Sequence, residues 1–119
     1  MYEEFQKREV PVTLIRNTDE TTSPTERVQR VLAAYGDNPN VVIISNHINA
    51  AGSDIQGAEG AKVIYALRDN DNLASNILTA LGNAGQKMRK VYQRRYPSDT
   101  SKDYYFMHRN TGSQTQQVV

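Results

Sequence analysis

The sequence has no cysteine, and its charges almost cancel to a net charge of +1. Without cysteine there can be no disulfide framework, no thiolate zinc site and no cysteine nucleophile. His, Asp and Glu are left as the strong candidate metal ligands. A nearly neutral chain also argues against a histone-like partner and against a wholly electrostatic grip on nucleic acid or membrane. Any such surface must be local.

Long hydrophobic runs are also missing, because no apolar run exceeds about five residues, far short of a membrane span. The first residues, Met1–Arg8, are charged from the third position, so we expect no signal peptide in this chain. If the protein acts outside a cell, something other than a signal peptide in this chain must deliver it. With 119 residues, of which 38% are hydrophobic, the chain fits one domain with a thin core.

The first half of the chain predicts a parallel βαβ unit. Residues 10–15 are rich in β-branched side chains and predict a strand. Ser23, Pro24 and Glu26 form a helix start with a capping box, and Gly36 marks the end of that helix. Residues 41–44 are a continuous apolar run, which predicts a strand covered on both faces. Strand, helix and strand in this order indicate a right-handed crossover.

The second half predicts a strand over 61–67, a long helix capped at 69–72 whose apolar stripe reaches Tyr92, and a polar loop over 96–102. A further strand is expected over 104–109, and another begins at 118–119. The fold class predicted from these elements is α/β, with a mixed twisted sheet flanked by helices and a parallel βαβ unit.

Polar residues Ser45–Ala50 follow the predicted buried strand, where open α/β sheets collect their ligands. Two interpretations of His47 stay open. Its side chain can cap the strand end and bind loop backbone, or it can serve as a metal ligand or general base. No second histidine stands at a metal-ligand spacing from it.

The sequence resembles the zinc-dependent N-acetylmuramoyl-L-alanine amidases of bacterial autolysins and phage endolysins. The similarity is carried by residues 12–19, Arg27, residues 43–50, residues 59–65 and residues 106–111. Their order and spacing fit the family across essentially the whole chain. The resemblance implies a peptidoglycan hydrolase that acts at the bacterial cell wall and cleaves the amide between the lactyl group of N-acetylmuramic acid and L-alanine.

The resemblance also implies roles for single residues. His47 would be one of three ligands of a Zn²⁺ ion that polarises water and the scissile carbonyl. Asn49 and Arg109 would bind substrate. The other ligands are expected before residue 1, and the general-base glutamate just after Val119. We therefore expect residues 1–119 to be a single, partial catalytic domain with an incomplete zinc site, inactive alone.

Other acids and the second histidine are weaker candidates for the site. Glu3 and Glu4 lie too close to Arg16 to replace the missing ligands of the family pattern. Asp54 and Glu59 are possible local ligands. His108, in the predicted strand over 104–109, is interpreted first as a packed or surface residue and second as one that approaches the site.

A basic patch of five cations is predicted on the long helix: Lys87, Arg89, Lys90, Arg94 and Arg95. A solvated helix face explains it, and attraction to anionic wall polymers or to nucleic-acid phosphates are the functional alternatives. Two other functions thus stay open, a non-catalytic cell-wall-binding remnant and a small nucleic-acid-binding α/β domain. We also expect self-association through an unpaired sheet edge.

Overall fold

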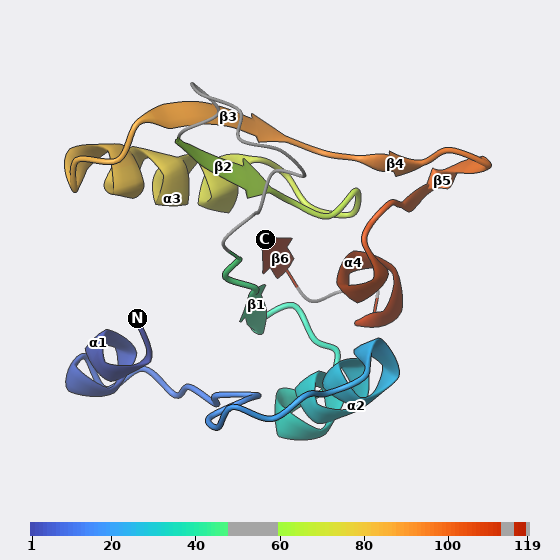
Figure 1. Ribbon diagram of the computed structural model, residues 1–119, viewed down its shortest axis with the longest axis horizontal. Helices are drawn as coiled ribbons and strands as arrows, with labels where there is room; N and C mark the ends of the chain where they lie inside the picture. The colour runs from blue at the N-terminus through green and yellow to red at the C-terminus, as the bar shows by residue number, and fades with distance from the viewer. Residues whose placement is uncertain (48–59, 113–115, 119) are drawn as a thin grey trace.

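The computed structural model describes residues 1–47, 60–112 and 116–118, which form small parallel and antiparallel sheets flanked by helices (Figure 1). The elements in chain order are α1 (Tyr2–Lys7), α2 (Pro24–Tyr35), β1 (Val42–Ile44), β2 (Ala61–Ile64), α3 (Asn72–Asn83), β3 (Met88–Tyr92), β4 (Arg95–Tyr96), β5 (Asp99–Asp103), α4 (Phe106–Asn110) and β6 (Gln116–Val118). The predicted α/β class is confirmed.

Helix α2 has the bounds that its capping signals predict. The Ser23 hydroxyl accepts a hydrogen bond from the Glu26 amide at 3.2 Å, and proline occupies the first helical position. Val28 and Val31 are buried, so this apolar face of the helix packs toward the protein. The chain leaves the helix at Gly36 with φ of 72°, a conformation that glycine adopts without strain.

Strand β1 is confirmed, but its surroundings differ from the prediction. It pairs in parallel with β6, with Ile43 opposite Gln117. Val42 and Ile44 are 46% and 37% exposed, so the expectation of a strand covered on both faces is wrong. An apolar run of this length indicates a strand but does not determine how many neighbours it has.

The strand predicted over 10–15 is wrong, and with it the crossover from that segment to β1. The structure shows residues 8–23 without helix or strand. Pro11 has no amide hydrogen to give a strand partner. The Ile15 carbonyl instead accepts a hydrogen bond from Arg30 Nη1 at 3.1 Å. Side-chain bonding to α2 thus replaces sheet pairing in this segment.

The parallel βαβ unit lies further along the chain, as β2–α3–β3. Strands β2 and β3 pair in parallel, with Val63 opposite Val91, and α3 packs on them through Ala74 and Leu78. The predicted helix to Tyr92 is wrong beyond Asn83. At Gly85 φ is 99°, which breaks the helical backbone and lets the chain return as β3.

The segment 95–110 reverses two predictions. The expected loop over 96–102 contains the antiparallel pair β4–β5, which projects as an arm in Figure 1. The expected strand over 104–109 is instead largely the short helix α4. Local bonds favour the helix, because the Arg109 amide donates to the Tyr105 carbonyl at 3.1 Å and the Thr111 hydroxyl donates to the Met107 carbonyl at 2.6 Å.

In Figure 1 the pair β1–β6 lies between the N-terminal helices and the β2–α3–β3 unit, and α4 lies beside α2. Each strand in the described residues has one partner. The expected self-association through a free edge therefore stays a prediction. Among the described helices, none has the length and apolar character needed to cross a membrane.

Candidate functional site

A cavity of about 150 Å³, which we call the His47 cavity, lies where the start of α2, the end of β1 and the start of α4 meet. The exposed imidazole of His47 lines it, and His47 Nε2 lies 2.7 Å from the Ser45 hydroxyl. The serine hydroxyl can donate to Nε2 or accept from it, and either arrangement leaves Nδ1 for a ligand or a proton. The residues that line the cavity are Pro24, Arg27, Ser45, His47, Tyr105, Phe106 and Met107.

Two sets of lining residues were not predicted as parts of the site. Arg27 comes from the first turn of α2, and its Nε donates to the buried Thr22 hydroxyl at 2.9 Å. Tyr105, Phe106 and Met107 come from the start of α4. The dense aromatic run Tyr104–Phe106 was a signal in the sequence, but the strand expected there gave no reason to bring it to His47.

His108 does not line the His47 cavity. It is a helical residue, 1% exposed, whose Nδ1 lies 3.8 Å from Asp103 Oδ1. Asp103 Oδ1 already accepts a hydrogen bond from the Leu67 amide, and neither His108 ring nitrogen has a hydrogen-bond partner in the described residues. Burial lowers the pKa of His108 to about 4; nearby Asp103 opposes this shift and Arg68 adds to it. The ring is therefore neutral at pH 7, as its packed interpretation requires.

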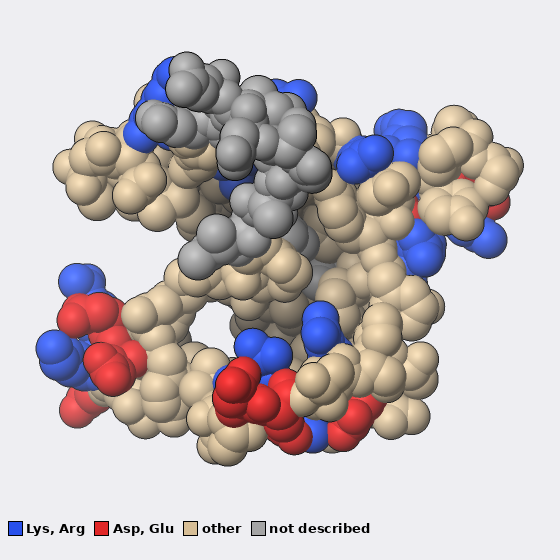
Figure 2. All heavy atoms as spheres, in the orientation of Figure 1, with Lys and Arg blue, Asp and Glu red and all other residues tan. Residues whose placement is uncertain are grey.

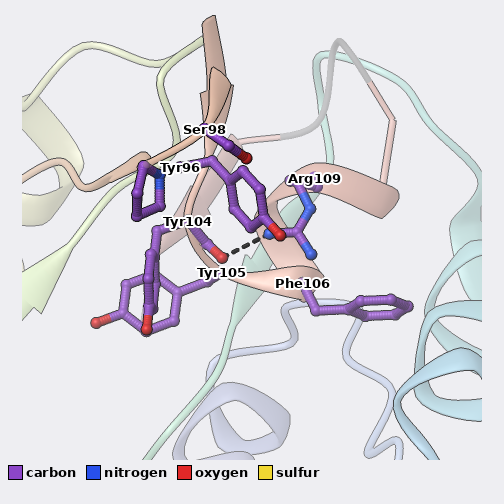
Figure 3. A pocket seen from close by; sticks show the side chains of 7 residues that line it. Tyr96, Ser98, Tyr104, Tyr105, Phe106 and Arg109 are labelled. Atoms are coloured by element: carbon purple, nitrogen blue, oxygen red, sulfur yellow. Dashed lines mark hydrogen bonds between the residues drawn. The ribbon is translucent and has the colours of Figure 1, made fainter. Parts of the chain in front are cut away.

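Arg109 lines a second, open cavity of about 520 Å³ between the β4–β5 arm and α4 (Figure 3). We call it the aromatic cavity, and its lining consists of Tyr96, Pro97, Ser98, Tyr104, Tyr105, Phe106 and Arg109. Arg109 Nη1 donates to the Tyr104 carbonyl at 2.6 Å and to the Asp103 carbonyl at 3.1 Å. Its guanidinium carbon lies 4.9 Å from the Tyr96 ring centroid and 5.8 Å from that of Phe106.

The basic patch is not on a helix. Its five members lie in and beside β3 and β4, and all five are exposed. We call them the cationic strip: Lys87, Arg89, Lys90, Arg94 and Arg95. The helix-dipole explanation is therefore wrong. Within the described part of the chain, none of them forms an ion pair with an acid. In Figure 2 acidic side chains gather over α1 and α2, while basic ones predominate over the β4–β5 arm.

The fit of a zinc ion can be tested on these residues. Among the described residues, no three His, Asp or Glu side chains come together as a metal site. A catalytic zinc takes three protein ligands. His47 alone therefore does not make one. Asn49 of the predicted site and the weaker candidates Asp54 and Glu59 lie outside the described residues.

The arrangement is that of an α/β domain with a polar, histidine-bearing strand end next to a helix start. The family model for N-acetylmuramoyl-L-alanine amidase (Amidase_3) matches residues 1–116. The chain therefore belongs to this family, which confirms the resemblance seen in the sequence and supports peptidoglycan at the cell wall as the family's target.

A solved structure supports the same fold. The chain is similar to Cwp6 from Clostridium difficile, with a TM-score of 0.77 and 25% sequence identity, over 98% of this chain. It spans 18% of the length of that solved chain. No curated protein sequence matches the chain significantly.

Proposed function

We propose that this chain takes part in hydrolysis of the amide that joins the lactyl group of N-acetylmuramic acid to L-alanine in peptidoglycan. The observation that carries the proposal is the family match over residues 1–116. The geometry agrees with it, since His47 stands exposed in a cavity at the carboxyl end of a parallel strand. That edge is where α/β sheets place their ligands.

His47 is the described residue that we propose as a metal ligand. If its Nε2–H donates to the Ser45 hydroxyl, Nδ1 keeps a lone pair for coordination. The His47 side chain is exposed, so packing does not block a metal ion from reaching it. The family's zinc would need ligands from beyond the described residues, so we derive no reaction step through it. Asn49 and Arg109 remain our proposals for substrate contacts.

The described residues supply one exposed histidine to the cavity and no second ligand beside it. We therefore propose that residues 1–119 alone do not turn over substrate. Arg27 adds a cation to the His47 cavity, which suits it to hold a carbonyl or carboxylate group near the imidazole. The alternative function is a non-catalytic, cell-wall-binding remnant. It would use the same contacts but would not hydrolyse the amide even within a longer polypeptide.

The test compares the 119 residues with the longest natural polypeptide that contains them, each incubated with purified peptidoglycan and zinc. We expect the longer form to release products with new L-alanine amino termini and no new reducing sugar ends. His47→Ala should abolish this release, whereas the adjacent exposed Asn46→Ala should retain it. New reducing ends, or release that survives His47→Ala, would contradict the proposal. Release by the 119 residues alone would overturn only their expected inactivity.

Failure of every form to release products, with binding to the wall retained, would favour the remnant.

A further inference from the structure

Aromatic side chains are concentrated in the lining of the aromatic cavity. Four of the chain's nine tyrosines and phenylalanines line it, and two of these, Tyr96 and Phe106, are 39% and 37% exposed. Its volume of about 520 Å³ falls within the range typical of small-molecule sites. Exposed rings that face a concave surface indicate a ligand with apolar faces.

Arg109 gives this cavity its polar group. Two backbone carbonyls hold its Nη1, at 2.6 and 3.1 Å, so the side chain is fixed in place. Within the described part of the chain, its Nε and Nη2 make no hydrogen bond. In Figure 3 the guanidinium lies between the Tyr96 ring and the Phe106 side chain. Fixed donors flanked by ring faces suit a flat ligand that carries hydroxyl or amide oxygens along its edge.

The aromatic cavity adjoins the His47 cavity. Tyr105 and Phe106 line both, so the start of α4 forms their common wall. A substrate with its scissile amide at His47 and a further group beyond α4 would therefore contact both cavities. In that substrate the amide has a sugar on one side and a peptide on the other. Pyranose rings have apolar C–H faces and polar edges, which match ring faces with a fixed arginine.

We propose that the aromatic cavity is a carbohydrate subsite that holds an N-acetylated hexosamine ring of the glycan strand, with Tyr96 and Phe106 against the ring faces and Arg109 on its oxygens. This inference rests on the proposed function for the identity of the glycan. It places the sugar toward the β4–β5 arm and leaves the stem peptide to the opposite side of His47. Tyr96 and Phe106 thereby become specificity residues rather than catalytic ones.

The probe is an oligosaccharide of β-1,4-linked N-acetylglucosamine, which carries no peptide and no scissile amide. Titrated into the isotope-labelled 119-residue chain without zinc, it should give saturable, weak binding, with NMR shifts at residues 96–109. Tyr96→Ala and Phe106→Ala should each weaken binding by about tenfold or more. The matched control is Tyr35→Ala, whose ring is 46% exposed on α2, and it should bind like the unmodified chain.

Circular dichroism checks that each variant folds. If one of the two ring variants does not fold, the other still tests the proposal. Absence of saturable binding would overturn the proposal, as would equal affinity in the ring variants and the control. Binding of a free stem peptide at these residues in place of the sugar would overturn it too. His47→Ala should leave oligosaccharide affinity unchanged, so this result is independent of the amide-release assay. Failure of amide release and failure of oligosaccharide binding can therefore be told apart.

Discussion

The imidazole of His108 and the carboxylate of Asp103 lie 3.8 Å apart in the interior, where both side chains are at least nine-tenths buried. Burial of the imidazole, which Asp103 offsets only in part, makes stability depend on pH. The pKa of His108 is about 4 in the folded protein, against an ordinary value of 6.5. As the pH falls below 6.5, the unfolded chain takes up the proton first, so the free energy of unfolding decreases until about pH 4.

The decrease should be about 3 kcal/mol for this one residue, since one pKa unit corresponds to about 1.4 kcal/mol. Urea unfolding between pH 7 and pH 4 measures it, with His108→Gln as the comparison. Other carboxylates titrate in both proteins, so the difference between the two curves isolates the histidine. Parallel curves would show that His108 titrates normally when folded.

Arg30 holds the segment before α2 in place. Its guanidinium donates to the Ile15 carbonyl and pairs with Glu20 at 2.7 Å and with Glu26 at 2.8 Å. We expect Arg30→Lys to release residues 8–23, because an ammonium cannot reproduce this planar set of contacts. Limited proteolysis should then cut that segment several times faster. Lys7→Ala, which breaks an exposed pair with Glu4, should leave the cleavage rate unchanged.

Gly60 and Gly85 offer a matched pair of substitutions with positive φ, 116° and 99°. A Cβ at Gly85 meets nothing within 4 Å, so Gly85→Ala should cost about 1–2 kcal/mol from backbone strain alone. At Gly60 a Cβ would lie 2.7 Å from the Lys87 carbonyl, which accepts the Ala61 amide. Gly60→Ala should therefore cost clearly more in thermal unfolding. Equal losses would mean that the start of the β2–β3 pairing tolerates displacement.

The cationic strip should bind polyanions through charge alone. Five exposed cations, which form no ion pair with an acid in the described part of the chain, attract phosphate or sulfate groups without reading a sequence. We expect retention on a heparin column that falls steeply with salt and decreases when Lys90 and Arg95 are both changed to glutamine. The same change at Lys7 and Arg8, beside the acids of α1, should have little effect. Preference for one DNA sequence over others would contradict this prediction and favour the nucleic-acid function.

Local signals predicted α2 and β1 well, but not the segments 10–15 and 95–110. Ser23, Pro24 and Gly36 determine the ends of α2 by short-range hydrogen bonds and backbone freedom, which the sequence displays directly. The apolar run that forms β1 was equally visible. The partner of β1 was not, because β6 lies more than seventy residues further on and its pairing leaves no periodic mark.

The site was predicted in part for the same reason. Because His47 follows an apolar run, the sequence placed it at the end of a strand. The family of the chain was indicated by the resemblance. The aromatic residues beside it were hidden, since Tyr104–Phe106 has high strand propensity while Asn110 and Thr111 stabilise a helix through bonds to the Phe106 and Met107 carbonyls. Propensity and these local side-chain bonds point in opposite directions, and the bonds prevail in the folded chain.

The pairing of β1 with β6 also orders events during synthesis. Strands β2 and β3 are joined by one helix and can pair soon after Tyr92 has left the ribosome. Strand β1 must wait for residues 116–118, so its hydrogen-bonded ladder forms after the βαβ unit has folded. Until then Val42 and Ile44 sit on a strand without a partner. The histidine edge is thus assembled after the β2–α3–β3 unit, against a scaffold already in place.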